Sequence, residues 1–68
     1  MTAQEAREAQ LENAYQPERA KALLLLAKLT RLVEGHDTLT RGKRVWGDVG
    51  DMERVSASVQ VAIDVLAV

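Results

Sequence analysis

The stretch Ala22-Leu23-Leu24-Leu25-Leu26-Ala27 places four leucines in succession. Successive side chains of an α-helix point about 100° apart, so these four leucines cover nearly the whole circumference of a helix. A single partner helix covers only part of that surface. We therefore expect this helix to be buried on two sides and the protein to be an oligomer.

The size and composition of the chain also favour oligomerisation. The chain has 68 residues, no cysteine and one histidine. Below about 70 to 80 residues, one hydrophobic core rarely contributes more than about 3 to 5 kcal/mol, so small proteins add disulfide bonds, a structural metal ion or a partner chain. Disulfides require cysteine, and one histidine does not form a structural zinc site unaided. Association with another copy remains, and we predict no metal and no cofactor.

Proline and glycine predict the boundaries of the first helices. Residues 1–16 are expected to form a weak N-terminal helix, because their apolar positions are mostly alanine. Pro17 disfavours helical geometry at the residue before it, which predicts a new helix over residues 17–34 rather than a kink in a continuing one. Gly35 suits the left-handed position that ends many helices. Residues 35–50 then form a glycine-rich, basic loop.

A last helix is predicted over residues 51–68. Asp48 or Asp51 is expected to cap its N-terminus, and their three-residue spacing is similar to that of a capping box. Apolar side chains recur at helical spacing in two rows: Met52, Val55, Val59, Ala62, Ile63 and Leu66, and then Val61, Val65 and Val68. The β-branched residues from Val59 to Val65 also allow an alternating strand. The helix is favoured because the polar residues between them fit the helical period better.

These elements predict an all-α fold. The two long helices have similar expected lengths, which favours an antiparallel helical hairpin with the weak N-terminal helix beside it. Two such hairpins would pair as a homodimeric four-helix bundle with helix crossing angles near 20°. The additional apolar faces would form the oligomer interface, whose predicted residues are Leu23, Leu24, Ala27, Val61 and Val65.

The loop between the long helices is the predicted functional surface. Its segment from Gly35 to Trp46 is basic, with a net charge of +2, because three cations stand against Asp37 alone. The cations are Arg41, Lys43 and Arg44, and Trp46 adds an aromatic ring. A connection this long is unusual between neighbouring helices of a bundle. The pattern around Gly42 also allows a short β-hairpin.

Three hypotheses apply to this loop. In the first, Trp46 packs over the end of the bundle and the basic side chains pair with Asp48 and Asp51. In the second, the loop docks a partner protein. In the third and least favoured, charge and stacking bind single-stranded nucleic acid, although three cations are few for strong affinity.

Patterns for catalysis or metal binding are weak. Adjacent His36 and Asp37 rarely hold the geometry of a base and its orienting carboxylate, and no nucleophile motif accompanies them. Asp48 and Asp51 with Glu53 could bind a divalent ion loosely, but their spacing does not match an EF-hand loop. The glycines do not form a phosphate-binding loop. We expect a protein that is not an enzyme.

No apolar stretch approaches the roughly 18 to 20 residues that span a bilayer, and the N-terminus lacks the apolar region of a signal peptide. We expect a cytoplasmic protein, and the abundance of Arg, Ala and Val suggests a bacterial or bacteriophage origin. The favoured function is that of a regulator, adaptor or accessory protein that binds a partner protein through the loop over residues 35–50 or through the alanine-rich N-terminal helix. The alternative is a nucleic-acid-associated regulator that uses the Arg41 to Trp46 loop.

Overall fold

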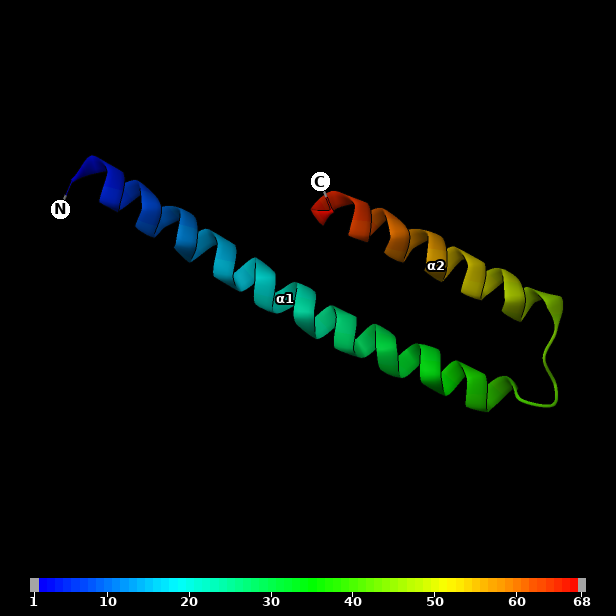
Figure 1. The fold of residues 1–68 in the computed structure, drawn as a ribbon. Helices are drawn as coiled ribbons and strands as arrows, with labels where there is room; N and C mark the ends of the chain where they lie inside the picture. Colours follow the sequence, from blue (N-terminus) through cyan, green and yellow to red (C-terminus); the bar gives the residue numbers. More distant parts are fainter. Residues whose placement is uncertain (1, 68) are drawn as a thin grey trace. The chain divides into compact units, whose positions relative to one another are not determined.

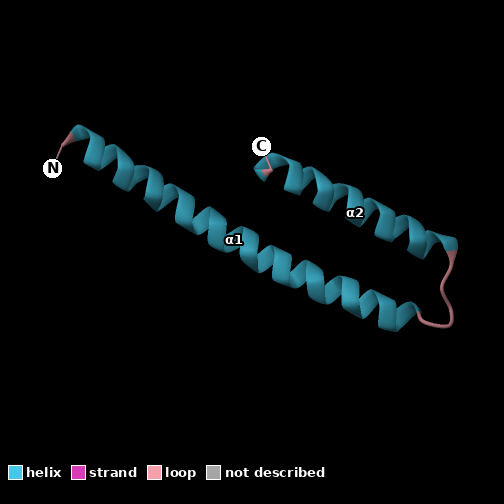
Figure 2. Cartoon of the chain, in the orientation of Figure 1, coloured by secondary structure: helices cyan, strands magenta, loops and turns pink. Residues whose placement is uncertain are grey.

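The computed structural model describes residues 2–67. Within this range the chain forms two helices, α1 (Ala3–Thr40) and α2 (Trp46–Leu66), and no strand (Figure 1, Figure 2). The all-α prediction is confirmed, and both strand alternatives, over residues 59–65 and around Gly42, are wrong. The chain divides into two compact units, one up to Leu32 and one from Val33 onward.

A capping box that was not predicted closes the N-terminus of α1. The backbone N–H of Glu5 donates to Thr2 Oγ1 at 3.1 Å, and the backbone N–H of Thr2 donates to the Glu5 carboxylate at 3.4 Å. The first turn of a helix leaves its N–H groups unpaired, and this arrangement satisfies two donors at once. Side-chain bonds one turn apart support the same alanine-rich segment: Gln4 to Glu8 at 3.3 Å and Gln16 to Glu12 at 2.6 Å.

Pro17 lies inside α1, so the predicted division into helices over residues 1–16 and 17–34 is wrong. Proline cannot donate to the carbonyl of Asn13, and a proline in a helix interior costs about 3 kcal/mol. The helix tolerates this proline because every residue from Thr2 to Lys28 is exposed, so water can hydrogen-bond the freed carbonyl. Good helix formers on both sides favour continuation of the helix.

The end of α1 lies beyond the predicted stop at Gly35, which is helical. Gly42 has a φ of +80°, a left-handed conformation that glycine adopts without the steric penalty of a Cβ atom. The backbone N–H of Lys43 donates to the carbonyl of Thr40 at 3.0 Å and closes the turn. Gly42 is therefore the glycine that follows the helix end. The predicted loop over residues 35–50 shrinks to residues 41–45.

The start of α2 also differs from its prediction, since the helix begins at Trp46 with Val45 as the N-cap residue. The Asp48 carboxylate accepts the backbone N–H of Val45 at 2.9 Å, and the backbone N–H of Asp48 donates to the Val45 carbonyl at 3.0 Å. Valine has no side-chain acceptor, so only this half of a capping box forms. Asp48 acts from the third helical position, where a negative charge also favours the helix dipole. The expectation that Asp48 or Asp51 is the N-cap residue is wrong.

The unit from Val33 onward is consistent with the predicted helical hairpin, which turns at residues 41–45. Its half-buried side chains recur at helical spacing on each helix: Val33, His36 and Thr40 on α1, and Asp48, Met52, Val55 and Val59 on α2. None of the residues 2–67 is buried. The hairpin therefore has a seam of partial contacts but no enclosed hydrophobic core.

The unit up to Leu32 consists of α1 alone, so it contains no second element against which the helix can pack. All four leucines of the run from Leu23 to Leu26 are exposed. The stretch that gives the strongest hydrophobic signal in the sequence thus faces solvent in a single copy of the chain.

The two helices differ in length, with 38 residues in α1 and 21 in α2. The expectation of similar lengths is wrong because α1 absorbs the N-terminal segment and passes through Pro17. Despite the length of α1, neither helix in the described range contains an apolar window that could cross a bilayer.

Candidate functional site

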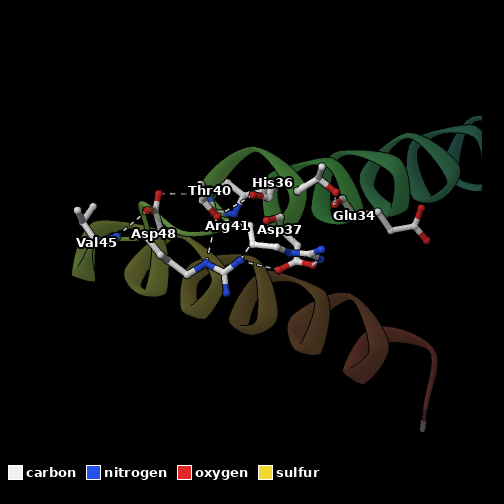
Figure 3. A network of polar contacts seen from close by, with 9 residues as sticks. Glu34, His36, Asp37, Thr40, Arg41, Val45 and Asp48 are labelled. Atoms are coloured by element: carbon white, nitrogen blue, oxygen red, sulfur yellow. Dashed lines mark hydrogen bonds and ion pairs between the residues drawn. The ribbon is translucent and has the colours of Figure 1, made fainter.

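Asp37 lies at the centre of a polar network at the turn of the hairpin (Figure 3). Its carboxylate accepts Arg41 Nη2 at 2.8 Å and Arg44 Nη2 at 2.6 Å. Arg44 Nη2 also lies 3.1 Å from the Asp37 carbonyl oxygen, and Arg44 Nε donates to Thr40 Oγ1 at 3.2 Å. Arg41 follows Asp37 by one helical turn, whereas Arg44 reaches it from beyond the turn at Gly42. The network therefore ties the connection to the end of α1.

The two arginines lower the pKa of Asp37 below its ordinary value. The hydrogen bond from Arg41 is the largest cause and the bond from Arg44 is the next. Both favour the charged form of the carboxylate. All three side chains are substantially exposed, so solvent screens these ion pairs. We conclude that the network orients the turn and contributes little to the stability of the fold.

His36 and Asp48 connect the two helices of the hairpin. His36 Nε2 lies 3.5 Å from Asp48 Oδ1, and the two side chains are 27% and 19% exposed. The second oxygen of the same carboxylate accepts the backbone N–H of Val45. Asp48 therefore has two structural roles, since it caps α2 and faces the chain's one histidine.

A cavity of about 340 Å³ lies beside this pair. Its apolar lining comes from both helices and consists of Val33, Val49 and Met52. Its polar lining consists of His36, Asp37, Arg44 and Asp48. Its volume is at the low end of the roughly 300 to 1,000 Å³ typical of small-molecule pockets. None of the lining residues is a serine, threonine, cysteine or lysine.

An exposed apolar patch lies at the same turn. Trp46 is 87% exposed, and Val45 and Val49 are also accessible. Together with Arg44 they line a second, shallower hollow. We call Val45, Trp46 and Val49 the tip patch. The expectation that the basic side chains pair with Asp48 and Asp51 is wrong for both arginines, which pair with Asp37. Trp46 faces solvent in the single chain, so its packing over the end of a bundle stays a prediction.

The structure brings the predicted loop residues to one end of the hairpin, since Arg41, Lys43, Arg44 and Trp46 all lie within or next to residues 41–45. The predicted interface residues are divided between the units, with Leu23, Leu24 and Ala27 in the first and Val61 and Val65 in the second. All five are exposed. Their role in an interface stays a prediction.

Three contacts of the site were not predicted from the sequence. The i, i+4 spacing of Asp37 and Arg41 is a usable signal for their ion pair. The spacing between Asp37 and Arg44 carries no such signal, because it depends on the turn at Gly42. The approach of His36 to Asp48 depends on the continuation of α1 past Gly35, whereas the sequence predicted that the helix ends at this glycine.

Comparisons of the chain with protein-family models, with curated proteins and with solved structures gave no match. Its function is therefore inferred from the residues at the turn and from the exposed faces of the helices.

Proposed function

We propose that this chain is a small protein-interaction module that assembles as a homodimeric four-helix bundle. The observation that carries the proposal is that no residue between 2 and 67 is buried, although 47% of the sequence is hydrophobic. Burial of apolar surface is the main favourable contribution to folding and is worth about 25 cal/mol per Å². A second copy of the chain would bury the surface that one copy leaves exposed.

The lengths of the helices limit which part of α1 can enter such a bundle. The 21 residues of α2 match residues 20–40, the equally long part of α1 next to the turn. This part contains Leu23, Leu24 and Ala27, and α2 contributes Val61 and Val65. In a two-fold dimer the same patch of both copies meets, so identical apolar faces can cover each other. The formal net charge of −1 per chain opposes this association only weakly.

The tip patch and the turn are the proposed surface for a partner protein. A bundle built from the helix faces would leave the turn at its end, in contact with solvent. Exposed tryptophan and arginine are the residue types that contribute most to protein interfaces. Here Asp37 binds both Arg41 and Arg44, and Arg44 lines a shallow hollow together with Trp46. An arginine that is already oriented lowers the entropy that binding must overcome.

Binding of nucleic acid is the second candidate function. The exposure of Trp46 favours it, because an exposed ring can stack on a base, and Lys43 and the arginines lie close by in the chain. Asp37 argues against it, since one carboxylate occupies both arginines. A fluorescence titration of Trp46 with single-stranded and duplex oligonucleotides separates the two functions: quenching that weakens with salt would favour nucleic acid, and no binding at low salt would eliminate it.

The partner-binding proposal is tested by affinity purification from the native host. The wild-type chain is compared with Trp46→Ala and with Leu11→Ala, a control that removes another exposed apolar side chain, far from the turn in sequence. A partner retained by the wild type and the control but lost with Trp46→Ala is expected. Equal retention by all three chains would contradict a role for the tip patch.

A further inference from the structure

We propose that His36, Asp48 and Asp51 form a binding site for a divalent transition-metal ion such as Zn²⁺ or Co²⁺. Each residue offers one ligand atom, and the three atoms lie within 4.8 Å of one another. His36 comes from the end of α1, whereas the two aspartates lie one turn apart at the start of α2. The site is independent of the proposed partner binding and of dimer formation.

The distance between His36 and Asp48 fits a bound ion better than a direct contact. His36 Nε2 and Asp48 Oδ1 are 3.5 Å apart, which is longer than the roughly 2.7 to 3.2 Å of an N–H···O hydrogen bond. Nitrogen and oxygen ligands each lie about 2.0 to 2.2 Å from zinc, and two ligands of a tetrahedral ion are then about 3.4 Å apart. An ion between the two atoms therefore needs almost no rearrangement of this pair.

The positions of both half-buried ligands are already fixed. The second oxygen of Asp48 accepts the backbone N–H of Val45 at 2.9 Å, which leaves Oδ1 facing His36. A bond from a ligating carboxylate to a second group is a common way of orienting metal ligands. His36 lies within α1, where the helix restricts its backbone. Two of the three ligands are thus pre-oriented before an ion binds.

Asp51 supplies the adjustable third ligand. Its side chain is 57% exposed, and its ion pair with Arg54 is long, at 4.0 Å. An exposed pair of this kind contributes little, so Asp51 can turn toward the ion at small cost. The movement needed is small, because its oxygen already lies within 4.8 Å of both other ligand atoms.

The charges and ligand types favour a transition metal over calcium or magnesium. Neutral imidazole with two carboxylates balances a charge of +2, and imidazole is a ligand of zinc, cobalt, nickel and copper. Calcium prefers six to eight oxygen ligands, and magnesium needs near-ideal octahedral oxygen geometry. Arg44 lines the same cavity, but its guanidinium is bonded to Asp37 and Thr40. Three protein ligands leave coordination positions for water.

Such an ion would link the last turns of α1 to the first turn of α2 within the hairpin. It would add a constraint across a seam that contains no buried residue in the described range. The sequence pattern did not indicate this set of ligands, because they lie on both sides of a turn and their spacing along the chain does not match an EF-hand loop.

The test uses the full chain without an affinity tag and with Zn²⁺ or Co²⁺ as the probe. Titration calorimetry measures affinity and stoichiometry, and NMR follows the imidazole of His36, whose signals need no assignment because it is the one histidine in the sequence. We expect one ion per chain and shifted imidazole signals. We also expect a visible absorption band of bound Co²⁺.

Two variants carry matched changes of charge. Asp51→Asn removes a ligand, and Glu53→Gln removes the same charge two residues further along α2. We expect Asp51→Asn to weaken Zn²⁺ binding by at least about tenfold, and Glu53→Gln to change it by less than about twofold, since screening limits the effect of a nearby surface charge. Far-UV circular dichroism verifies that both variants keep their helices. The melting temperature should rise with Zn²⁺ in the wild type and in Glu53→Gln, but much less in Asp51→Asn.

Three results would overturn the site. The first is an absence of Zn²⁺ binding to the wild type at millimolar concentration. The second is a Zn²⁺ affinity that is equal in the wild type and Asp51→Asn, which would show that Asp51 is not a ligand. An equal loss of affinity in both variants would likewise overturn the site, because it would indicate general attraction of the ion to negative charge. The third is one ion per two chains, because the proposed ligands belong to one hairpin.

Discussion

Substitution of Leu24 by glutamate tests the proposed dimer most directly. Leu24 is 73% exposed in the single chain, so most of its side chain is available for burial by a second copy. In isolation the substitution should harm the helix little. The new carboxylate would stand four residues before Lys28, a spacing that favours a helix by about 0.2 to 0.5 kcal/mol.

The expected loss of dimer stability follows from the exposed fraction of Leu24. Full burial of a leucine side chain contributes about 1.5 to 3 kcal/mol. With 73% of the side chain still to be buried, the loss is about 1 to 2 kcal/mol per chain and about 2 to 4 kcal/mol per symmetric dimer. Since about 1.4 kcal/mol corresponds to a tenfold change in Kd, dimerisation should weaken by about 30- to 700-fold. The cost of burying a charge makes this a lower bound.

Sedimentation equilibrium is the appropriate assay, because the mass of one chain is 7.5 kDa and a dimer doubles it. Leu11→Glu provides the control. Leu11 is 64% exposed, belongs to the same helix and lies outside residues 20–40, so its substitution should leave the dimer intact.

The reasoning is refuted if the wild-type chain is a folded monomer at micromolar concentration, or if Leu24→Glu dimerises as tightly as the wild type. Equal dissociation of Leu11→Glu and Leu24→Glu would refute the placement of the interface. A folded, dimeric Leu24→Glu would show that Leu24 faces solvent in the assembly.

Three further predictions concern α1 and its turn. Asp37 has a lowered pKa in the folded chain, so its ion pairs with Arg41 and Arg44 contribute stability above the unfolded pKa of about 3.9. This contribution is lost as the pH falls through the lower pKa of the folded chain. The NMR signals of the arginine side chains should report the loss between about pH 2 and 5, and Asp37→Asn should remove the transition. Pro17→Ala should stabilise the helical state by up to about 3 kcal/mol and raise the helix signal in circular dichroism; an unchanged or lower signal would show that the chain is not helical through residue 17. Gly42→Ala should lower the free energy of unfolding by about 1 to 2 kcal/mol because Gly42 has a positive φ. Gly35→Ala should raise it by about 0.5 to 1 kcal/mol, since the space around the added Cβ is open. Chemical denaturation measures both changes, and changes of the same sign would contradict the assigned end of α1.

The fold class could be predicted from the sequence because helical periodicity and strong helix formers extend over most of the chain. The boundaries could not. Pro17 and Gly35 are the residues that most often end helices, and both lie inside α1. Local rules failed at these positions because proline and glycine only penalise a helix by a few kcal/mol, and the favourable neighbours on both sides outweigh the penalty.

The candidate site was predictable only in part. The clustering of Arg41, Lys43, Arg44 and Trp46 follows from their proximity in sequence. Their partners depend on the turn: Asp37 meets Arg44, and His36 meets Asp48, only after Gly42 adopts its left-handed conformation. The sequence alone does not indicate which of its four glycines takes that role.

The unequal lengths of the helices have a consequence for the architecture of a dimer. α1 exceeds α2 by 38 − 21 = 17 residues, which corresponds to about 26 Å of helix. In a dimer built from residues 20–40 and α2, residues 3–19 of each chain would have no equally long part of α2 to pair with. In an antiparallel dimer the two turns would lie at opposite ends of the bundle, so the assembly would be bivalent, able to hold two binding partners or to bridge two sites on one.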